Sequence, residues 1–109
     1  MADTEVKLWN FIKPGLLGSW HRLEVTTANG IPDAMGMYAG SAHFVELKVG
    51  PPSIKALRPP QFDFFCEALR QGVSVWVLFR HRGILKWYAG LPVGDPSPPP
   101  RFYRAAPSR

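Results

Sequence analysis

The chain has 109 residues, and 46% of them are apolar. This length fits one domain, and this composition excludes a disordered chain. Its one cysteine, Cys66, excludes a disulfide framework and a thiolate metal cluster. No apolar run reaches the length of a membrane span, and the first residues have neither the basic flank nor the apolar run of a signal peptide, so we expect a soluble cytoplasmic protein. The net charge of +5 suits either a polyanionic partner or solubility alone.

The first half of the chain predicts one helix and three strands. Apolar spacing favours a helix over residues 4–13, which Pro14-Gly15 ends. Alternating and β-branched stretches predict strands over 19–27, 34–40 and 43–49.

A second helix and two more strands follow. Pro59 or Pro60 opens a helix whose apolar residues recur at helical spacing, and Gly72 ends it. The apolar run over 73–79 is typical of a buried central strand, and a further strand is expected over 84–90. The order α-β-β-β-α-β-β predicts an α/β domain with a mixed central sheet flanked by helices.

The C-terminal segment has a different composition. We expect a single domain over residues 1–91 and a tail over 92–109, rich in proline and arginine, that is extended and only partly ordered. The tail either supplies electrostatic attraction through its arginines or packs on a partner subunit through Phe102 and Tyr103. The tryptophans are expected in the core or at an interface, with Trp76 in the core.

Three charged residues surround the second and third strands. Glu46 and Lys48 are two apart on a strand, so both side chains leave one face. If the strands over 34–40 and 43–49 form a hairpin, Asp33 lies near Glu46. Two carboxylates beside an ammonium suit Mg²⁺, a bound water and hydrolysis of a phosphodiester. The alternative is an ordinary half-exposed strand, with the intervening core residues Val45, Leu47 and Val49 on its other face.

A longer pattern contains these three residues. Gly30-Ile31-Pro32-Asp33 is followed by Val45-Glu46-Leu47-Lys48, then by Arg58-Pro59-Pro60-Gln61 at a helix start and Gly72-Val73-Ser74-Val75 after that helix. The pattern resembles the PD-(D/E)XK nucleases, and within them the VRR-NUC family. That family includes stand-alone phage and bacterial proteins related to Holliday junction resolvases. The resemblance implies a restriction-endonuclease-like core, a location in a bacterial or phage-infected cell and dependence on Mg²⁺, for which Mn²⁺ substitutes.

The resemblance also implies roles for particular residues. Asp33, Glu46 and the backbone carbonyl of Leu47 would hold the metal, while Lys48 and Gln61 would complete the catalytic group. A glutamate on the first helix completes the metal site in the family. Glu5 matches it by element and by its distance ahead of Asp33, and it is favoured for this role; Glu24, on the strand before Asp33, is the rival.

The implied substrate is branched DNA, above all the four-way junction. Its two equivalent strands suit a homodimer with one site per chain. Basic residues in loops and at element ends would contact phosphates without reading sequence, although each alone is also explained as a surface charge. They are Lys13, Lys55, Arg58, Arg80, Arg82, Arg101 and Arg104. The alternatives are a flap, nicking or restriction-like nuclease of the same fold, and a DNA-binding accessory protein without catalysis.

Overall fold

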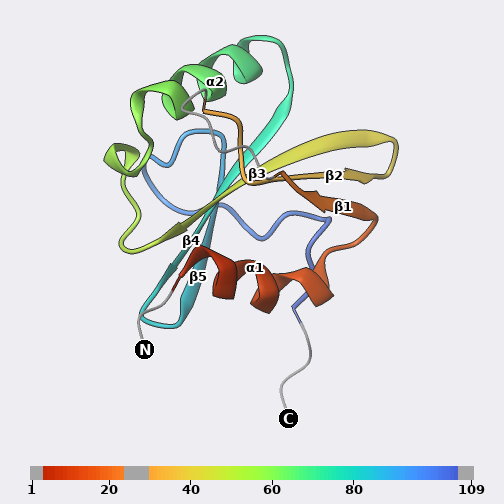
Figure 1. Ribbon diagram of the computed structural model, residues 1–109. Coiled ribbons are helices and arrows are strands. Elements are labelled where there is room, and N and C mark those ends of the chain that lie inside the picture. Colours follow the sequence, from red (N-terminus) through yellow and green to blue (C-terminus); the bar gives the residue numbers. More distant parts are fainter. Residues whose placement is uncertain (1–3, 24–29, 106–109) are drawn as a thin grey trace.

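The computed structural model describes residues 4–23 and 30–105, and its centre is one five-stranded sheet. Neighbouring strands lie in chain order, β1-β2-β3-β4-β5, and only β3 and β4 run parallel. The helices α1 and α2 lie on opposite sides of this sheet (Figure 1). The elements are α1 (Glu5–Ile12), the 3-10 turn η1 (Lys13–Gly15), β1 (Ser19–Arg22), β2 (Ala34–Tyr38), β3 (Ser41–Val49), the 3-10 turn η2 (Ile54–Ala56), α2 (Pro59–Arg70), β4 (Ser74–His81) and β5 (Ile84–Ala89).

The predicted order of helices and strands and the mixed sheet are confirmed. The strand predicted over 34–40 ends at Tyr38, because Ala39 and Gly40 take positive φ angles of 52° and 80° and turn the chain. The strand predicted over 19–27 ends at Arg22. Residues 24–29, which include Glu24, lie outside the described residues.

The α1 face of the sheet carries the larger core. Leu8, Trp9 and Ile12 of α1 are buried against Val45 and Leu47 of β3. Thr4 caps this helix, since its side chain accepts a hydrogen bond from the Lys7 amide at 3.1 Å. The cap and the buried face together fix where the first turn of α1 meets the sheet.

The α2 face carries a second core. Phe65 and Ala68 of α2 pack over Val75, Val77 and Phe79 of β4. Both faces of the β3–β4 pair are therefore covered, and a polar side chain on β3 must find partners within the protein. The prediction of a core position for Val49 is wrong, because this residue ends β3 and is 37% exposed.

The C-terminal segment completes the α1 face. The Phe102 ring is 2% exposed and lies 4.9 Å from Trp20 and 5.9 Å from Trp87, centroid to centroid. Backbone hydrogen bonds from Leu17 N to Phe102 O, at 2.7 Å, and from Arg104 N to Gly15 O, at 2.9 Å, fasten the segment. The alternative that Phe102 packs on a partner subunit is wrong, because its own chain buries the ring.

Among the described residues, no helix has the length and apolar character that crossing a membrane requires.

Candidate active site

Asp33 is brought to β3 by the β2–β3 pairing. The strands are antiparallel with Ala34 opposite Val45, so the preceding Asp33 lies beside Glu46. The Leu47 amide donates a hydrogen bond to Asp33 Oδ2 at 2.8 Å. The predicted hairpin is therefore present, and a backbone donor of β3 holds the aspartate in place.

A glycine sets the path of the chain before Asp33. Gly30 has φ 78°, and a Cβ atom there would lie 2.1 Å from the backbone oxygen of Pro60. Only glycine fits this left-handed position against the first turn of α2. The close approach brings the Asp33 segment and the start of α2 to the same place on the sheet.

Gln61 connects the two charged residues of β3. Its Nε2 donates to Glu46 Oε2 at 2.9 Å, and its Oε1 accepts from Lys48 Nζ at 3.1 Å. The same Oε1 accepts from the Arg58 amide at 2.9 Å, which fixes the amide orientation at the start of α2. Lys48 Nζ also lies 3.4 Å from Glu46 Oε2. One buried carboxamide therefore orients both the carboxylate and the ammonium.

Glu46 is 2% exposed, which is unusual for a carboxylate. Burial, and next the negative charge of Asp33, raise the pKa of Glu46 to about 8, although the charge and hydrogen bond of Lys48 oppose the shift. Glu5 raises this pKa further. A cation beside Glu46 would offset its repulsion from Asp33 and lower its pKa.

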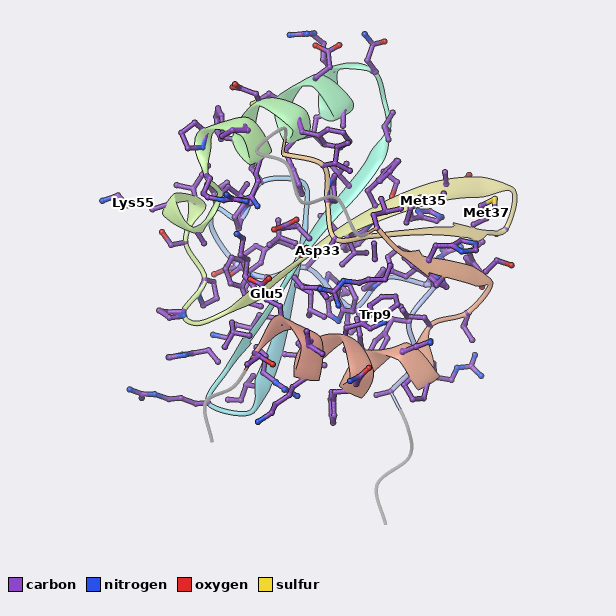
Figure 2. The ribbon with its side chains drawn as sticks, in the orientation of Figure 1. Glu5, Trp9, Asp33, Met35, Met37 and Lys55 are labelled. Atoms are coloured by element: carbon purple, nitrogen blue, oxygen red, sulfur yellow. The ribbon has the colours of Figure 1, made fainter. Side chains whose placement is uncertain are left out.

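Glu5 lies in the same electrostatic cluster. Figure 2 shows it at the start of α1, on the side of the helix that faces Asp33. Burial and the charge of Asp33 raise the pKa of Glu5, while the charges of Lys48, Arg22 and Arg58 lower it. Hydrogen bonds and an ion pair thus bring together the predicted residues Lys48, Glu46 and Gln61, with Asp33 on the neighbouring Leu47 amide. Glu5 interacts with this group through its charge. The rival Glu24 lies outside the described residues.

The donor set has the chemistry that a hard divalent cation prefers. Asp33 and Glu46 supply carboxylate oxygens, and Mg²⁺ needs only one or two protein carboxylates because it keeps several waters. Within residues 4–23 and 30–105, no three His, Cys, Asp or Glu side chains form a group that could hold a metal ion. Asp33 and Glu46 by themselves still fit a site of two carboxylates, because Mg²⁺ completes its coordination with waters. The metal, and the Leu47 carbonyl as its ligand, stay predictions.

The predicted DNA-binding residues do not form one cluster. Arg58 is at the site, because its backbone amide donates a hydrogen bond to Gln61 Oε1 and its positive charge lowers the pKa of Glu5. Lys55, on η2, points away from the sheet (Figure 2). The Arg80 guanidinium lies 5.1 Å from the Phe11 ring, on the α1 side. The others are spread over the 3-10 turn η1 (Lys13), the β4–β5 turn (Arg82) and the C-terminal segment (Arg101 and Arg104).

Arg22 belongs to the site but was not predicted from the sequence. Its charge lowers the pKa of Glu5, and its guanidinium lies 5.9 Å from the Trp9 ring. Arg22 pairs in register with Ala34, the residue after Asp33. The pairing of β1 with β2 was the signal that could have found it, because this register places Arg22 opposite Ala34, the residue next to the aspartate.

These residues form one polar site: the buried carboxylate of Glu46 is linked to Lys48 through the Gln61 amide, and Asp33 lies beside them. No known family model matches the sequence, and no curated protein matches it. One similar solved structure is Hjc, a Holliday junction resolvase from the archaeon Archaeoglobus fulgidus. It is 15% identical, the match covers 78% of this chain and 72% of that one, and the TM-score is 0.48. At this level the likeness transfers no activity to this chain.

Proposed function

We propose that this chain is a divalent-metal-dependent nuclease that hydrolyses phosphodiester bonds in branched DNA, the four-way junction first. The observation that carries the proposal is the arrangement at β3. Glu46 and Lys48 are joined through Gln61, and Asp33 is held beside them by the Leu47 amide. An ordinary half-exposed strand would leave these charged side chains in water, whereas here they are largely buried, which is costly for charged groups.

Asp33 and Glu46 are the groups that would hold Mg²⁺ or Mn²⁺, with Glu5 and the Leu47 carbonyl as further candidates. When bound, such an ion neutralises charge on the phosphate and makes a bound water more acidic. These carboxylates repel one another in its absence, which agrees with the raised pKa values of Glu46 and Glu5.

Lys48 is the residue that would act on the water or the phosphate. Its side chain is 14% exposed, against 3% for Glu46, so it lies nearer the surface of the cluster. The hydrogen bond to Gln61 Oε1 limits the positions of its ammonium. An ammonium held there orients a water for in-line attack or stabilises the negative charge that develops on phosphorus. The resemblance implies products with a 3′ hydroxyl and a 5′ phosphate.

Junction DNA and a homodimer are the finer part of the proposal. One site per chain and two equivalent strands in a four-way junction favour a two-fold assembly. Contacts from basic residues to backbone phosphates would position the DNA without reading its sequence, so recognition would be of DNA shape.

The test is cleavage of a synthetic four-way junction, with a flap and a linear duplex as parallel substrates, in Mg²⁺ and in EDTA. We expect metal-dependent cleavage of the junction and a loss of at least roughly 100-fold in rate for Lys48→Ala. The matched control is Lys86→Ala, an exposed lysine on β5 that faces the same side of the sheet two strands away.

Each outcome decides something. Cleavage of flaps but not junctions would retain the nuclease and reject the junction resolvase. Equal behaviour of the wild type and Lys48→Ala on every substrate would reject the nuclease, and junction binding without cleavage would then favour an accessory protein.

A further inference from the structure

A concave site lies at the start of β3, away from the Glu46 cluster. Its volume is about 250 Å³, and its walls come from the β2–β3 turn, the start of β4 and the C-terminal segment. The residues that line it include Tyr38, His43, Ser74, Trp76, Arg101 and Phe102. Trp76 was predicted in the core, but it is only half-buried because part of its surface faces this cavity.

The cavity walls are held in place without a ligand. Ser74 Oγ accepts a hydrogen bond from Trp76 Nε1 at 3.0 Å and lies 2.8 Å from His43 Nδ1. The buried Phe102 ring lies 4.9 Å from His43 and 5.7 Å from Trp76, centroid to centroid. A ligand would therefore meet ordered rings, and its binding would not have to order them.

The lining indicates the chemistry of the occupant. Four of the nine lining residues carry an aromatic or imidazole ring, hydroxyl and ring nitrogen atoms lie among them, and the exposed Arg101 adds a cation. The volume is below the roughly 300–1,000 Å³ of pockets for drug-sized ligands, so the cavity suits one ring system. A planar ring with polar edges and an attached anion uses all of these groups, because rings stack and guanidinium binds phosphate.

We propose that this cavity binds one nucleoside phosphate, with the base against the rings of Trp76 and Tyr38 and the phosphate on Arg101. The nucleotide comes either from an unpaired position of a DNA strand or from free solution. An aliphatic ligand would gain little from the hydroxyls and the arginine, and a lone phosphate would gain little from the rings.

This site is separate from the one at Glu46. His43 precedes Glu46 by three residues, roughly 10 Å along a strand, and its side chain leaves the opposite face of β3. A nucleotide bound here would therefore not block access to the Glu46 cluster. The proposal therefore goes beyond the nuclease, and either could fail without the other.

Titration of deoxyadenosine monophosphate in EDTA, followed by ¹H–¹⁵N NMR, tests the proposal without any cleavage. We expect the indole N–H resonance of Trp76 to shift and that of Trp9, which lies in α1, to stay. Arg101→Gln should weaken binding at least tenfold. Arg70→Gln is the matched control, since it removes the same charge from an exposed arginine at the end of α2, outside the cavity lining, and it should change affinity less than twofold.

Two further probes are needed. One separates the contribution of the base from that of the phosphate, and the other distinguishes a nucleotide within a DNA strand from a nucleotide in free solution. Ribose 5-phosphate should bind at least tenfold more weakly than the nucleotide, because it has no ring to stack. A four-nucleotide strand is compared with the same strand carrying one abasic position. A shift at Trp76 with the intact strand alone supports the unpaired nucleotide, and a shift with the monophosphate supports the free one. The proposal is overturned if neither shifts Trp76, if ribose 5-phosphate binds equally well, or if Arg101→Gln and Arg70→Gln behave alike.

Discussion

Strand β3 passes through two very different environments. Toward its end, Glu46 and Lys48 lie among charged groups that are bonded to one another through Gln61. Near its start, His43 lies among aromatic rings that pack on the C-terminal Phe102. The first region is organised by hydrogen bonds within a buried polar cluster and the second by ring packing. The same strand therefore supports two regions that should respond differently to mutation, pH and ions.

The largest expected effect is on the aromatic region. Phe102→Ala should lower the free energy of unfolding by about 3–5 kcal/mol, because it leaves a cavity among Trp20, Trp76 and Trp87. Chemical denaturation measures it. Val93→Ala is the control, since Val93 precedes it in the same segment but is 60% exposed, and its effect should stay within about 0.5 kcal/mol. A loss below about 1 kcal/mol for Phe102→Ala would contradict the packing of this segment on the core.

The polar region should instead respond to pH. The folded state raises the pKa of Glu46 from 4.5 to about 8, so between these values the folded protein holds a proton that the unfolded chain releases. In EDTA, the free energy of unfolding should therefore fall by a few kcal/mol as the pH rises from about 5 to about 8, and level off above that. Denaturation at several pH values measures this, and added Mg²⁺ should reverse much of the loss at the upper end of the range.

Glu46→Gln isolates this contribution. The variant keeps the size of the side chain and removes its titration, so its stability should depend much less on pH over the same window. Glu5, whose pKa is also raised, would account for a remaining slope of the same sign. An unchanged pH dependence in Glu46→Gln would show that Glu46 is not the group that titrates.

An intermediate effect is expected at the residue that joins the charged groups. Gln61→Met should cost about 1–3 kcal/mol in stability, because Glu46, Lys48 and the Arg58 amide each lose a buried partner. It should also lower the rate of cleavage more than it weakens DNA binding, since Lys48 loses its fixed position. Gln71→Met is the control, at the exposed end of α2. Equal rates in the two variants would leave Gln61 a purely structural role.

The contrast between the two regions also explains what the sequence could predict. Glu46, Lys48 and Asp33 belong to one hairpin, so strand parity and a short turn were enough to predict that they lie together. Gln61 entered through the resemblance, but its position between Glu46 and Lys48 depends on Gly30 packing against Pro60, which no periodicity reveals. The aromatic region could not be predicted, because Phe102 reaches rings that are 15 to 82 residues away along the chain.

The smallest expected effect concerns the first turn of α1, which carries Glu5 to the polar region. Thr4→Ala removes the helix cap and should cost about 1 kcal/mol, while Thr4→Ser should keep the cap and most of the stability. If Glu5 belongs to the metal site, Thr4→Ala should also weaken Mn²⁺ binding a few-fold, because the turn that carries Glu5 frays. Calorimetric titration with Mn²⁺ measures this.

Glu5→Gln and Glu24→Gln then decide between the two candidates. A loss of Mn²⁺ affinity of tenfold or more in Glu5→Gln alone would assign the ligand to α1, because a neutral amide is a weaker ligand than a carboxylate. The same loss in Glu24→Gln alone would assign it to the segment before Asp33 and would make the Thr4 effect one of stability only. In the second case the raised pKa of Glu5 would follow only from its burial and from the nearby charge of Asp33.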